Sequence, residues 1–241
     1  MSGYDASRIN KSPGSRRITG AIFDCDGTLI DSLEAWRGIE GFLLGEARVS
    51  VTSAERALFA TFTIPEIATY FHEHYGLYAH AQAVIERIDE FMLAYYREKA
   101  TLMPGVAQFL ESCARNDVRM SVASSSPAAY LEAGLTCVGI RDYFVSVVSV
   151  DDVGASKREP VVFDKACCDM GTDIATTWGF EDSQYAMDTL RKAGYRVVGL
   201  YDELQGVSVA ETAQYADIVL ASFNNLSVVR GCLVECAGHN E

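Results

Sequence analysis

Residues 19–32 read Thr-Gly-Ala-Ile-Phe-Asp-Cys-Asp-Gly-Thr-Leu-Ile-Asp-Ser, and this stretch predicts the fold. Its apolar run, residues 21–23, is as short and continuous as a buried parallel strand. The run stops at Asp24, and Asp26 follows after one intervening residue. Open α/β sheets bind ligands beyond the carboxyl ends of their strands, so both carboxylates are expected at such an edge. Gly27 then favours a turn that a Cβ atom would hinder.

Two kinds of chemistry use a pair of carboxylates at the end of a strand. Carboxylate oxygens can hold a divalent cation, and a carboxylate can attack phosphorus to form an acyl-phosphate. The plainer alternative is a polar turn that caps the next helix, because Asp and Gly are common turn residues. The acid pair by itself leaves these alternatives open.

The rest of the chain alternates between short apolar runs and segments with helical periodicity. This alternation predicts an α/β fold with a Rossmann-like doubly wound parallel sheet. Residues 33–102 interrupt it with helical patterns alone, which indicates an inserted all-helical cap domain. The core domain is then residues 18–32 and 103–241, and residues 1–17 are expected to be a flexible N-terminal tail. Further strands are predicted at residues 118–123, 144–150, 176–180, 195–200 and 217–220.

Several helix starts can be predicted from local patterns. The segments Thr63–Glu66 and Ser208–Glu211 have the spacing of capping boxes. Ser32 and Ser126 are each expected to cap the helix that follows. The clearest amphipathic pattern covers residues 83–99.

Polar residues follow three of the predicted strands, and one lysine lies in a loop between them. Each has a plain explanation: a serine can cap a helix, an acid pair suits a helix N-terminus, and a loop lysine is usually solvated. Their order along the chain is what makes a shared site the better interpretation. These residues are Asp24 and Asp26, then Ser124 and Ser125, then Lys157, then Glu181 and Asp182.

The segment Asp24–Thr28, Asp-Cys-Asp-Gly-Thr, resembles the first motif of the haloacid dehalogenase superfamily, whose members are mostly phosphatases. Residues 29–32, Leu-Ile-Asp-Ser, resemble the β-phosphoglucomutase-like phosphatase branch. Lys157–Phe163 is similar to the third motif of the superfamily, and Trp178–Ser183 is similar to the fourth. The resemblance covers roughly residues 20–226.

This resemblance implies a Mg²⁺-dependent phosphatase that hydrolyses a small phosphorylated metabolite through an aspartyl-phosphate intermediate. It implies Asp24 as the nucleophile and Asp26 as the acid–base group. The implied phosphate ligands are Ser124, Ser125 and Lys157, and the implied Mg²⁺ ligands are Asp24, Asp26 through its carbonyl, Asp182 and Glu181.

Two alternatives remain beside the phosphatase. A phosphosugar mutase of the β-phosphoglucomutase type carries a histidine where this chain has Trp36, which argues against a mutase. A non-catalytic phosphate-binding module of the receiver type also uses acids, a hydroxyl and a lysine. Receivers place the phosphorylated Asp after a middle strand of the chain and have no counterpart of Asp26, so the enzyme is favoured.

The composition narrows the class of partner. The formal net charge of the 241 residues is −13, from 20 Lys and Arg against 33 Asp and Glu, which opposes binding to nucleic acids and anionic membranes. No apolar run is as long as a membrane span. The seven cysteines include no Cys-x-x-Cys pair, and no apolar signal segment is recognised, which indicates free thiols in a reducing cytoplasm. We expect a cytoplasmic monomer or weak dimer that binds a small phosphorylated metabolite.

Overall fold

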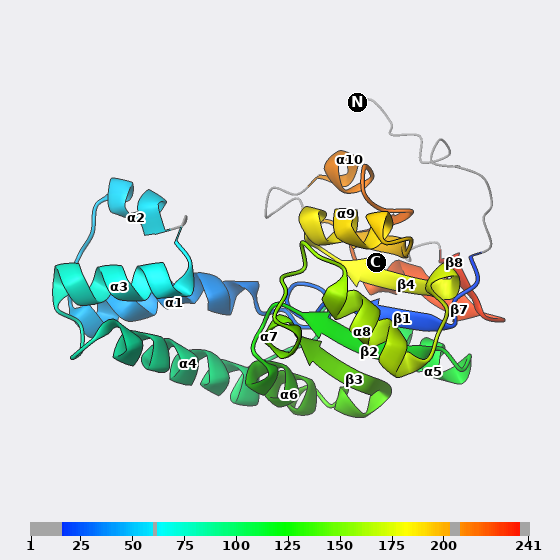
Figure 1. Cartoon of the computed structure of the whole chain (residues 1–241), viewed down its shortest axis with the longest axis horizontal. Coiled ribbons are helices and arrows are strands. Elements are labelled where there is room, and N and C mark those ends of the chain that lie inside the picture. Colours follow the sequence, from blue (N-terminus) through cyan, green and yellow to red (C-terminus); the bar gives the residue numbers. More distant parts are fainter. Residues whose placement is uncertain (1–15, 60–61, 203–207, 237–241) are drawn as a thin grey trace.

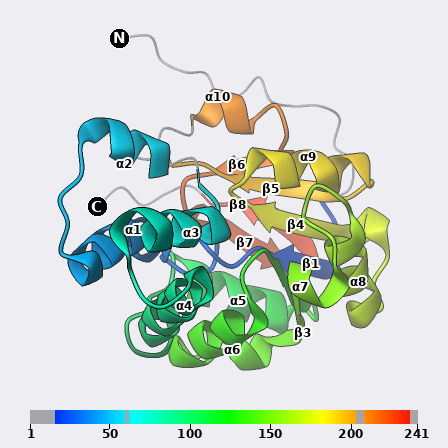
Figure 2. The same ribbon diagram turned by 60° about the vertical axis from the view of Figure 1, so that its left-hand side comes forward.

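The computed structural model describes residues 16–59, 62–202 and 208–236. Within them, six parallel strands form one sheet in the order β3-β2-β1-β4-β5-β6 (Figures 1 and 2). This is the order of a doubly wound sheet, in which the chain starts in the middle and winds to either side. The predicted α/β fold is therefore confirmed. The strands are β1 (Gly20–Phe23), β2 (Arg119–Ser124), β3 (Phe144–Ser149), β4 (Thr177–Glu181), β5 (Arg196–Leu200) and β6 (Ile218–Leu220).

Helices cover both faces of the sheet, because successive strand residues point to opposite sides. Phe23 belongs to the core cluster under α5 and α6, whereas Ile22 belongs to the cluster under α8 and α9. Both side chains are buried, as expected for a strand covered on both faces. The core helices are α5 (Val106–Arg115), α6 (Ala128–Cys137), α7 (Val150–Val153), α8 (Val161–Met170), α9 (Gln184–Lys192) and α10 (Val209–Thr212), with 3₁₀ turns at residues 141–143, 174–176 and 223–225.

In the described residues, four helices lie between β1 and α5, and they project away from the sheet (Figure 1). The segments that enter and leave this insertion run side by side. The Met103 N–H donates to the Leu29 carbonyl and the Asp31 N–H donates to the Thr101 carbonyl, each at 2.9 Å. The insertion is thus attached to the core by paired backbone segments. Its helices are α1 (Leu33–Ala47), α2 (Ser53–Phe59), α3 (Ile64–Tyr75) and α4 (Ala81–Glu98).

Two predicted helix caps are wrong. Ser32 precedes α1, but its side chain makes no capping hydrogen bond. The residue before α6 is Pro127, so Ser126 lies one position too early to cap that helix. Both serine hydroxyls instead donate to Asp26. The capping boxes that open α3 and α10 are present as predicted.

The C-terminal hairpin was not predicted from the sequence. Strands β7 (Leu226–Val229) and β8 (Cys232–Glu235) form a separate antiparallel pair. The predicted tail, residues 1–17, lies mostly outside the described residues. Its last two residues differ from the prediction, because Arg17 forms a β-bridge with Cys232 and the Arg16 carbonyl accepts the Leu233 N–H at 2.9 Å.

No helix in the described part of the chain combines the length and the apolar composition needed to cross a membrane.

Candidate active site at the carboxyl edge of the sheet

The sheet brings the acids of two sequence motifs together. Strands β1 and β4 are neighbours, with Phe23 opposite Phe180. The next residue on each strand is an acid, and the Asp24 N–H donates to the Phe180 carbonyl at 2.9 Å. One carboxylate oxygen from each of Asp24, Glu181 and Asp182 lies within 4.8 Å of the other two. Asp24 and Glu181, which are 157 positions apart in the sequence, therefore share one edge of the sheet.

Lys157 joins two of these acids. Its Nζ atom lies 2.5 Å from Asp24 Oδ1 and 2.5 Å from Glu181 Oε1. The Lys157 side chain is only 2% exposed, although it comes from the loop between α7 and α8. A buried ammonium group requires partners of this kind, since desolvation of an unpaired charge is costly. Lys157 is therefore a buried member of the acid cluster and not a solvated loop residue.

The electrostatics of the cluster are dominated by burial. Burial raises the pKa of Asp24 to about 7, against the attraction of Lys157 and with the help of the neighbouring Glu181 and Asp26. Burial likewise raises the pKa of Asp182 to about 7 and the pKa of Glu181 above its usual range. Burial would lower the pKa of Lys157, but attraction by Asp24 and Glu181 outweighs it, so this pKa is raised and the ammonium stays charged.

These residues fit a divalent cation. The three carboxylates carry more negative charge than Lys157 neutralises, and the raised pKa values of Asp24 and Asp182 reflect this deficit of positive charge together with burial. Carboxylate oxygens are the ligands that Mg²⁺ takes in proteins. The donor set of Asp24, Asp182 and Glu181 suits such an ion.

Gly27 is required by the close packing of the first motif. Its φ is +76°, a backbone conformation that favours glycine. A Cβ atom at this position would lie 2.5 Å from Asp182 Oδ2. Gly27 therefore lets the turn after β1 approach the acid that follows β4.

Asp26 lies in an environment of its own, formed by three hydroxyl groups. Its Oδ1 atom accepts from the Ser32 hydroxyl at 2.5 Å and also from the Tyr96 hydroxyl. Its Oδ2 atom accepts from the Ser126 hydroxyl at 2.5 Å. These three donors come from the start of the insertion, from α4 and from the loop after β2. Asp26 is thus held by groups that are separate from the Lys157 cluster.

Sequence reasoning missed these partners of Asp26. Ser32 and Ser126 were predicted as helix caps, and Tyr96 stood only as one residue of an amphipathic helix. Ser126 lies two positions after Ser124, which ends β2, and this position at a strand end was a signal that Ser126 could belong to the site. Nothing in the local sequence marks Tyr96, because its contact with Asp26 spans 70 residues.

Ser124 and Ser125 occupy different positions at the end of β2. Ser124 is buried, and its Oγ atom accepts the Ser126 N–H at 3.1 Å. Ser125 is exposed. Strand β2 pairs with β1 in register, with Val122 opposite Phe23. Ser124 ends β2 and Ser125 follows it, at the edge where Asp24 follows β1. The structure therefore brings the predicted hydroxyls to the same edge as the acids.

Cys25 lies between the two acids in sequence and is fully buried. Burial, and then the charges of Asp26 and Asp24, raise the pKa of its thiol well above the usual value. A thiol in this environment stays protonated and is a poor nucleophile. Its side chain therefore fills space in the core.

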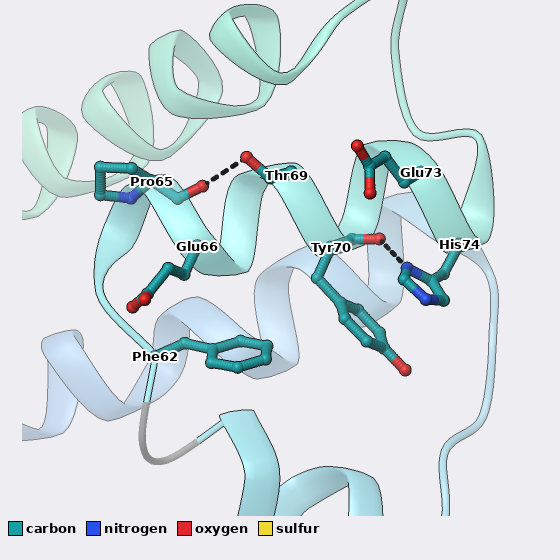
Figure 3. A pocket seen from close by; sticks show the side chains of 7 residues that line it. All are labelled: Phe62, Pro65, Glu66, Thr69, Tyr70, Glu73 and His74. Carbon is teal, nitrogen blue, oxygen red and sulfur yellow. Dashed lines mark hydrogen bonds between the residues drawn. The ribbon is translucent and has the colours of Figure 1, made fainter.

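Described residues of the helical insertion line at least two pockets. One of about 480 Å³ is lined by residues around the starts of α1 and α3 and the end of α2, and it includes Trp36 and Arg37. The other, of about 340 Å³, lies along α3, where the rings of Tyr70 and His74 stack at 3.9 Å between centroids (Figure 3). The residues that line this second pocket include no lysine or arginine, so it lacks the permanent cation that a phosphate site uses.

The fold and the site agree with a known family. The sequence model of the haloacid dehalogenase-like hydrolase family matches residues 21–200. This match covers most of the chain, and it includes the acid pair, Ser124, Lys157 and Glu181–Asp182. The chain therefore belongs to the haloacid dehalogenase-like hydrolase family, which confirms the family and the enzyme class indicated by its sequence motifs.

Individual relatives support the same class. The chain is 28% identical over 186 residues to hexitol phosphatase B from Escherichia coli, covering 76% of this chain and 83% of that protein. It is also 28% identical over 220 residues to phosphoglycolate phosphatase from Yersinia pseudotuberculosis, covering 88% and 92%. The fold is similar to that of a putative β-phosphoglucomutase from Thermotoga maritima, with a TM-score of 0.74, 19% identity, and coverage of 84% and 94%.

Proposed function

We propose that the protein is a Mg²⁺-dependent phosphatase that hydrolyses a small phosphorylated metabolite through an aspartyl-phosphate. One observation carries this proposal. A carboxylate at the end of the central strand, Asp24, lies against a buried lysine and two further acids, while a second carboxylate, Asp26, is held apart by hydroxyl groups. This arrangement offers a nucleophile and a separate proton-transfer group beside a site for phosphate and metal.

In the first half of the reaction, Asp24 attacks the phosphorus atom. The new bond joins an Asp24 oxygen to phosphorus, and the bond from phosphorus to the ester oxygen breaks. The departing alkoxide takes a proton from Asp26, which therefore acts as a general acid. Asp24 is the better nucleophile of the two because three hydroxyl donors occupy the oxygens of Asp26.

In the second half, water hydrolyses the aspartyl-phosphate. Asp26, now ionised, takes a proton from the attacking water, whose oxygen forms a bond to phosphorus while the bond between phosphorus and the Asp24 oxygen breaks. Inorganic phosphate leaves, and both acids return to their starting states. The same residue can serve as acid and then base because it is not needed as a nucleophile.

Phosphate binding is assigned to Lys157 with the hydroxyls of Ser124 and Ser125. The Lys157 ammonium has three donors, of which two serve Asp24 and Glu181 within the described residues. The third donor is the one assigned to a phosphate oxygen. Donors prearranged in a buried site stabilise the charge that develops on the phosphoryl group.

Mg²⁺ is assigned to the carboxylates of Asp24 and Asp182 and the carbonyl of Asp26, with Glu181 beside it. When bound, the ion supplies positive charge that offsets the repulsion between a carboxylate and a phosphate dianion. Glu181 also accepts from Lys157 and thereby orients the lysine.

Residues 33–102 are assigned as a cap domain on the core formed by residues 18–32 and 103–241. The insertion carries a pocket of about 480 Å³ that includes Trp36, and Trp36 is linked through Tyr96 to Asp26. We assign the non-phosphate part of the substrate to this pocket. A pocket of this size suits a small metabolite.

The proposal is tested by assaying the purified protein with Mg²⁺ against a panel of phosphate monoesters. The panel should contain a nitrophenyl ester, hexitol phosphates and phosphoglycolate. The last two are included because two relatives are named hexitol phosphatase B and phosphoglycolate phosphatase. We expect release of inorganic phosphate that stops when a chelator removes the metal. Absence of turnover on every ester would contradict the proposal, and transfer of phosphate between two hydroxyls of one sugar would indicate a mutase.

Metal binding can be tested without activity through Asp182. The pKa of its carboxyl is raised from 3.8 to about 7 by burial, so the unfolded chain loses this proton at lower pH than the folded protein. The free energy of unfolding of the metal-free protein should therefore fall as the pH rises from about 4 to about 7, and change little above that. Asp182→Asn should weaken this fall, because the amide does not ionise.

The measurement is the melting temperature with chelator and with Mg²⁺, at pH 5 and pH 8. Mg²⁺ binds ionised carboxylates, so it should raise the melting temperature of the wild type more at pH 8 than at pH 5. The Asp182→Asn variant should respond less to Mg²⁺. If the variant keeps both the pH dependence and the Mg²⁺ response of the wild type, Asp182 is not a metal ligand.

Replacement of Cys25 by alanine should leave most of the activity. The mechanism uses no thiol, and the buried side chain only fills space. We expect a kcat within about fivefold of the wild type and a modest loss of stability, on the order of 1 kcal/mol, from the small cavity. Steady-state kinetics and thermal melting check this. A folded Cys25→Ala variant without phosphoryl transfer would show that the thiol takes part.

A further inference from the structure

Tyr96 is a buried polar residue outside the motifs that define the family. It lies near the end of α4, in the helical insertion, and its side chain is fully buried. Its hydroxyl reaches across to the core and donates to Asp26 Oδ1. Burial and the proximity of Asp26 raise the pKa of Tyr96, so the phenol stays protonated and remains a donor. A buried hydroxyl that donates to the proposed acid–base group needs a functional explanation.

Trp36 donates a hydrogen bond to the same Tyr96 hydroxyl. The indole N–H of Trp36, in α1, lies 3.1 Å from the Tyr96 oxygen. An indole nitrogen can only donate, so the Tyr96 oxygen accepts this bond, and the Tyr96 hydroxyl donates its own proton to Asp26 Oδ1. Trp36, Tyr96 and Asp26 thus form a chain of two hydrogen bonds that runs from the insertion to the core. Such chains strengthen each member by polarisation.

The surroundings of Tyr96 hold its ring in place. The ring stacks on Tyr130 with centroids 5.3 Å apart and an interplanar angle of 26°. Helix α6 has Gly134 at the contact, where a Cβ atom would lie 2.8 Å from a Tyr96 ring carbon. The ring therefore fills a close-fitting space between α4 and α6, and its hydroxyl has little freedom of position.

We propose that Tyr96, supported by Trp36, is a positioning residue that fixes Asp26 for proton transfer to the leaving group. This inference rests on the proposed phosphatase function and adds a specific role for two residues of the insertion. Tyr96 touches neither the Lys157 cluster nor, in this assignment, the phosphate. It acts through Asp26 alone.

The geometry also distinguishes the two oxygens of Asp26. Oδ1 accepts from both Ser32 and Tyr96, whereas Oδ2 accepts from Ser126. A carboxylate oxygen offers two lone pairs, so Oδ1 is saturated and Oδ2 keeps one free. Oδ2 is therefore the oxygen that carries the transferred proton. Tyr96 holds the opposite oxygen and thereby sets the direction of that proton.

The test compares Tyr96→Phe with Tyr130→Phe. Both variants remove one phenolic hydroxyl from the same buried aromatic stack. The Tyr130 hydroxyl donates to Asp89 at 2.5 Å and not to Asp26, so it is a matched control for packing and for loss of a partly buried phenolic hydrogen bond. The substrates are an alkyl phosphate, whose leaving group needs a proton, and a nitrophenyl phosphate, whose leaving group scarcely does. Rapid-quench kinetics give the rate of the first step for each ester.

We expect Tyr96→Phe to slow the first step of the alkyl ester by about 10- to 100-fold, with KM changed less than about threefold. The first step of the nitrophenyl ester should change less than about threefold, and Tyr130→Phe should affect neither ester by more than this. Trp36→Phe should give a smaller loss of the same kind. Its effect on the rate of the first step should disappear in the Tyr96→Phe background, since Trp36 acts on Asp26 through the Tyr96 hydroxyl.

Equal slowing of both esters by Tyr96→Phe, or an equal loss in Tyr130→Phe, would overturn the proposal. If Tyr96→Phe does not fold, Trp36→Phe alone decides, and a loss that does not depend on the leaving group would overturn it too. Failure of the proposed function is distinguishable, because the wild type would then hydrolyse neither ester.

Discussion

Replacement of Asp24 by asparagine is expected to lower turnover of every phosphate ester on the order of 10⁴-fold or more, because it removes the proposed nucleophile. The amide has nearly the volume of the carboxylate, and Lys157 keeps Glu181 as a partner at 2.5 Å. The protein should therefore fold. Steady-state assays with a nitrophenyl ester and thermal melting test both statements.

The control for this experiment is Asp169→Asn. Asp169 pairs with Lys165 one turn away, at the end of α8, on the surface of the molecule. A surface pair of this kind contributes little to stability, roughly 0.5 kcal/mol or less, so this variant should retain wild-type activity. Turnover that persists in pure Asp24→Asn protein, after contamination by wild type is excluded, would remove Asp24 as the nucleophile.

Replacement of Asp26 by asparagine should separate the two halves of the reaction. A nitrophenyl ester has a good leaving group, so its first step should survive the loss of the general acid. Hydrolysis of the aspartyl-phosphate should not, because the attacking water must still lose a proton. The variant is expected to release a burst of roughly one equivalent of nitrophenol and then to turn over slowly, which is the kinetic sign of an accumulating covalent intermediate.

An alkyl phosphate supplies the internal control for the Asp26→Asn experiment. Its alkoxide leaves poorly without a proton, so no burst is expected, and the first step itself should be slow. Stopped-flow measurements on wild type and variant with both esters give the comparison. Equal slowing of both esters without a burst would mean that Asp26 serves the fold or the metal and not proton transfer.

The sequence by itself determined the class of fold and which strands end in polar residues of the candidate site. The apolar run before Asp24 and the later runs before Ser124 and Glu181 each end where a polar residue begins. Parallel strands share one carboxyl edge, so residues far apart in sequence were expected to meet there. The structure places them there, with β1 between β2 and β4. These features can be predicted from local sequence, because the positions of strand ends and turns depend on neighbouring residues.

Only the tertiary structure decided how Asp26 is held. Ser32 and Ser126 carry the usual signals of helix caps, yet both hydroxyls donate to Asp26. The partly buried carboxylate of Asp26 competes successfully for these donors, because a charged acceptor makes a stronger hydrogen bond than a backbone group. The sequence pattern could not show this competition, since the acceptor arrives from another part of the chain.

The role inferred for Tyr96 depends on packing in the same way. The amphipathic pattern of residues 83–99 did not single out Tyr96, yet its side chain is buried. Which group its hydroxyl meets depends on the paired segments at Leu29 and Met103, which attach the insertion to the core, and on the space that Gly134 leaves in α6. Local sequence specifies where helices and strands begin and end, whereas contacts between distant segments follow from how those elements pack together.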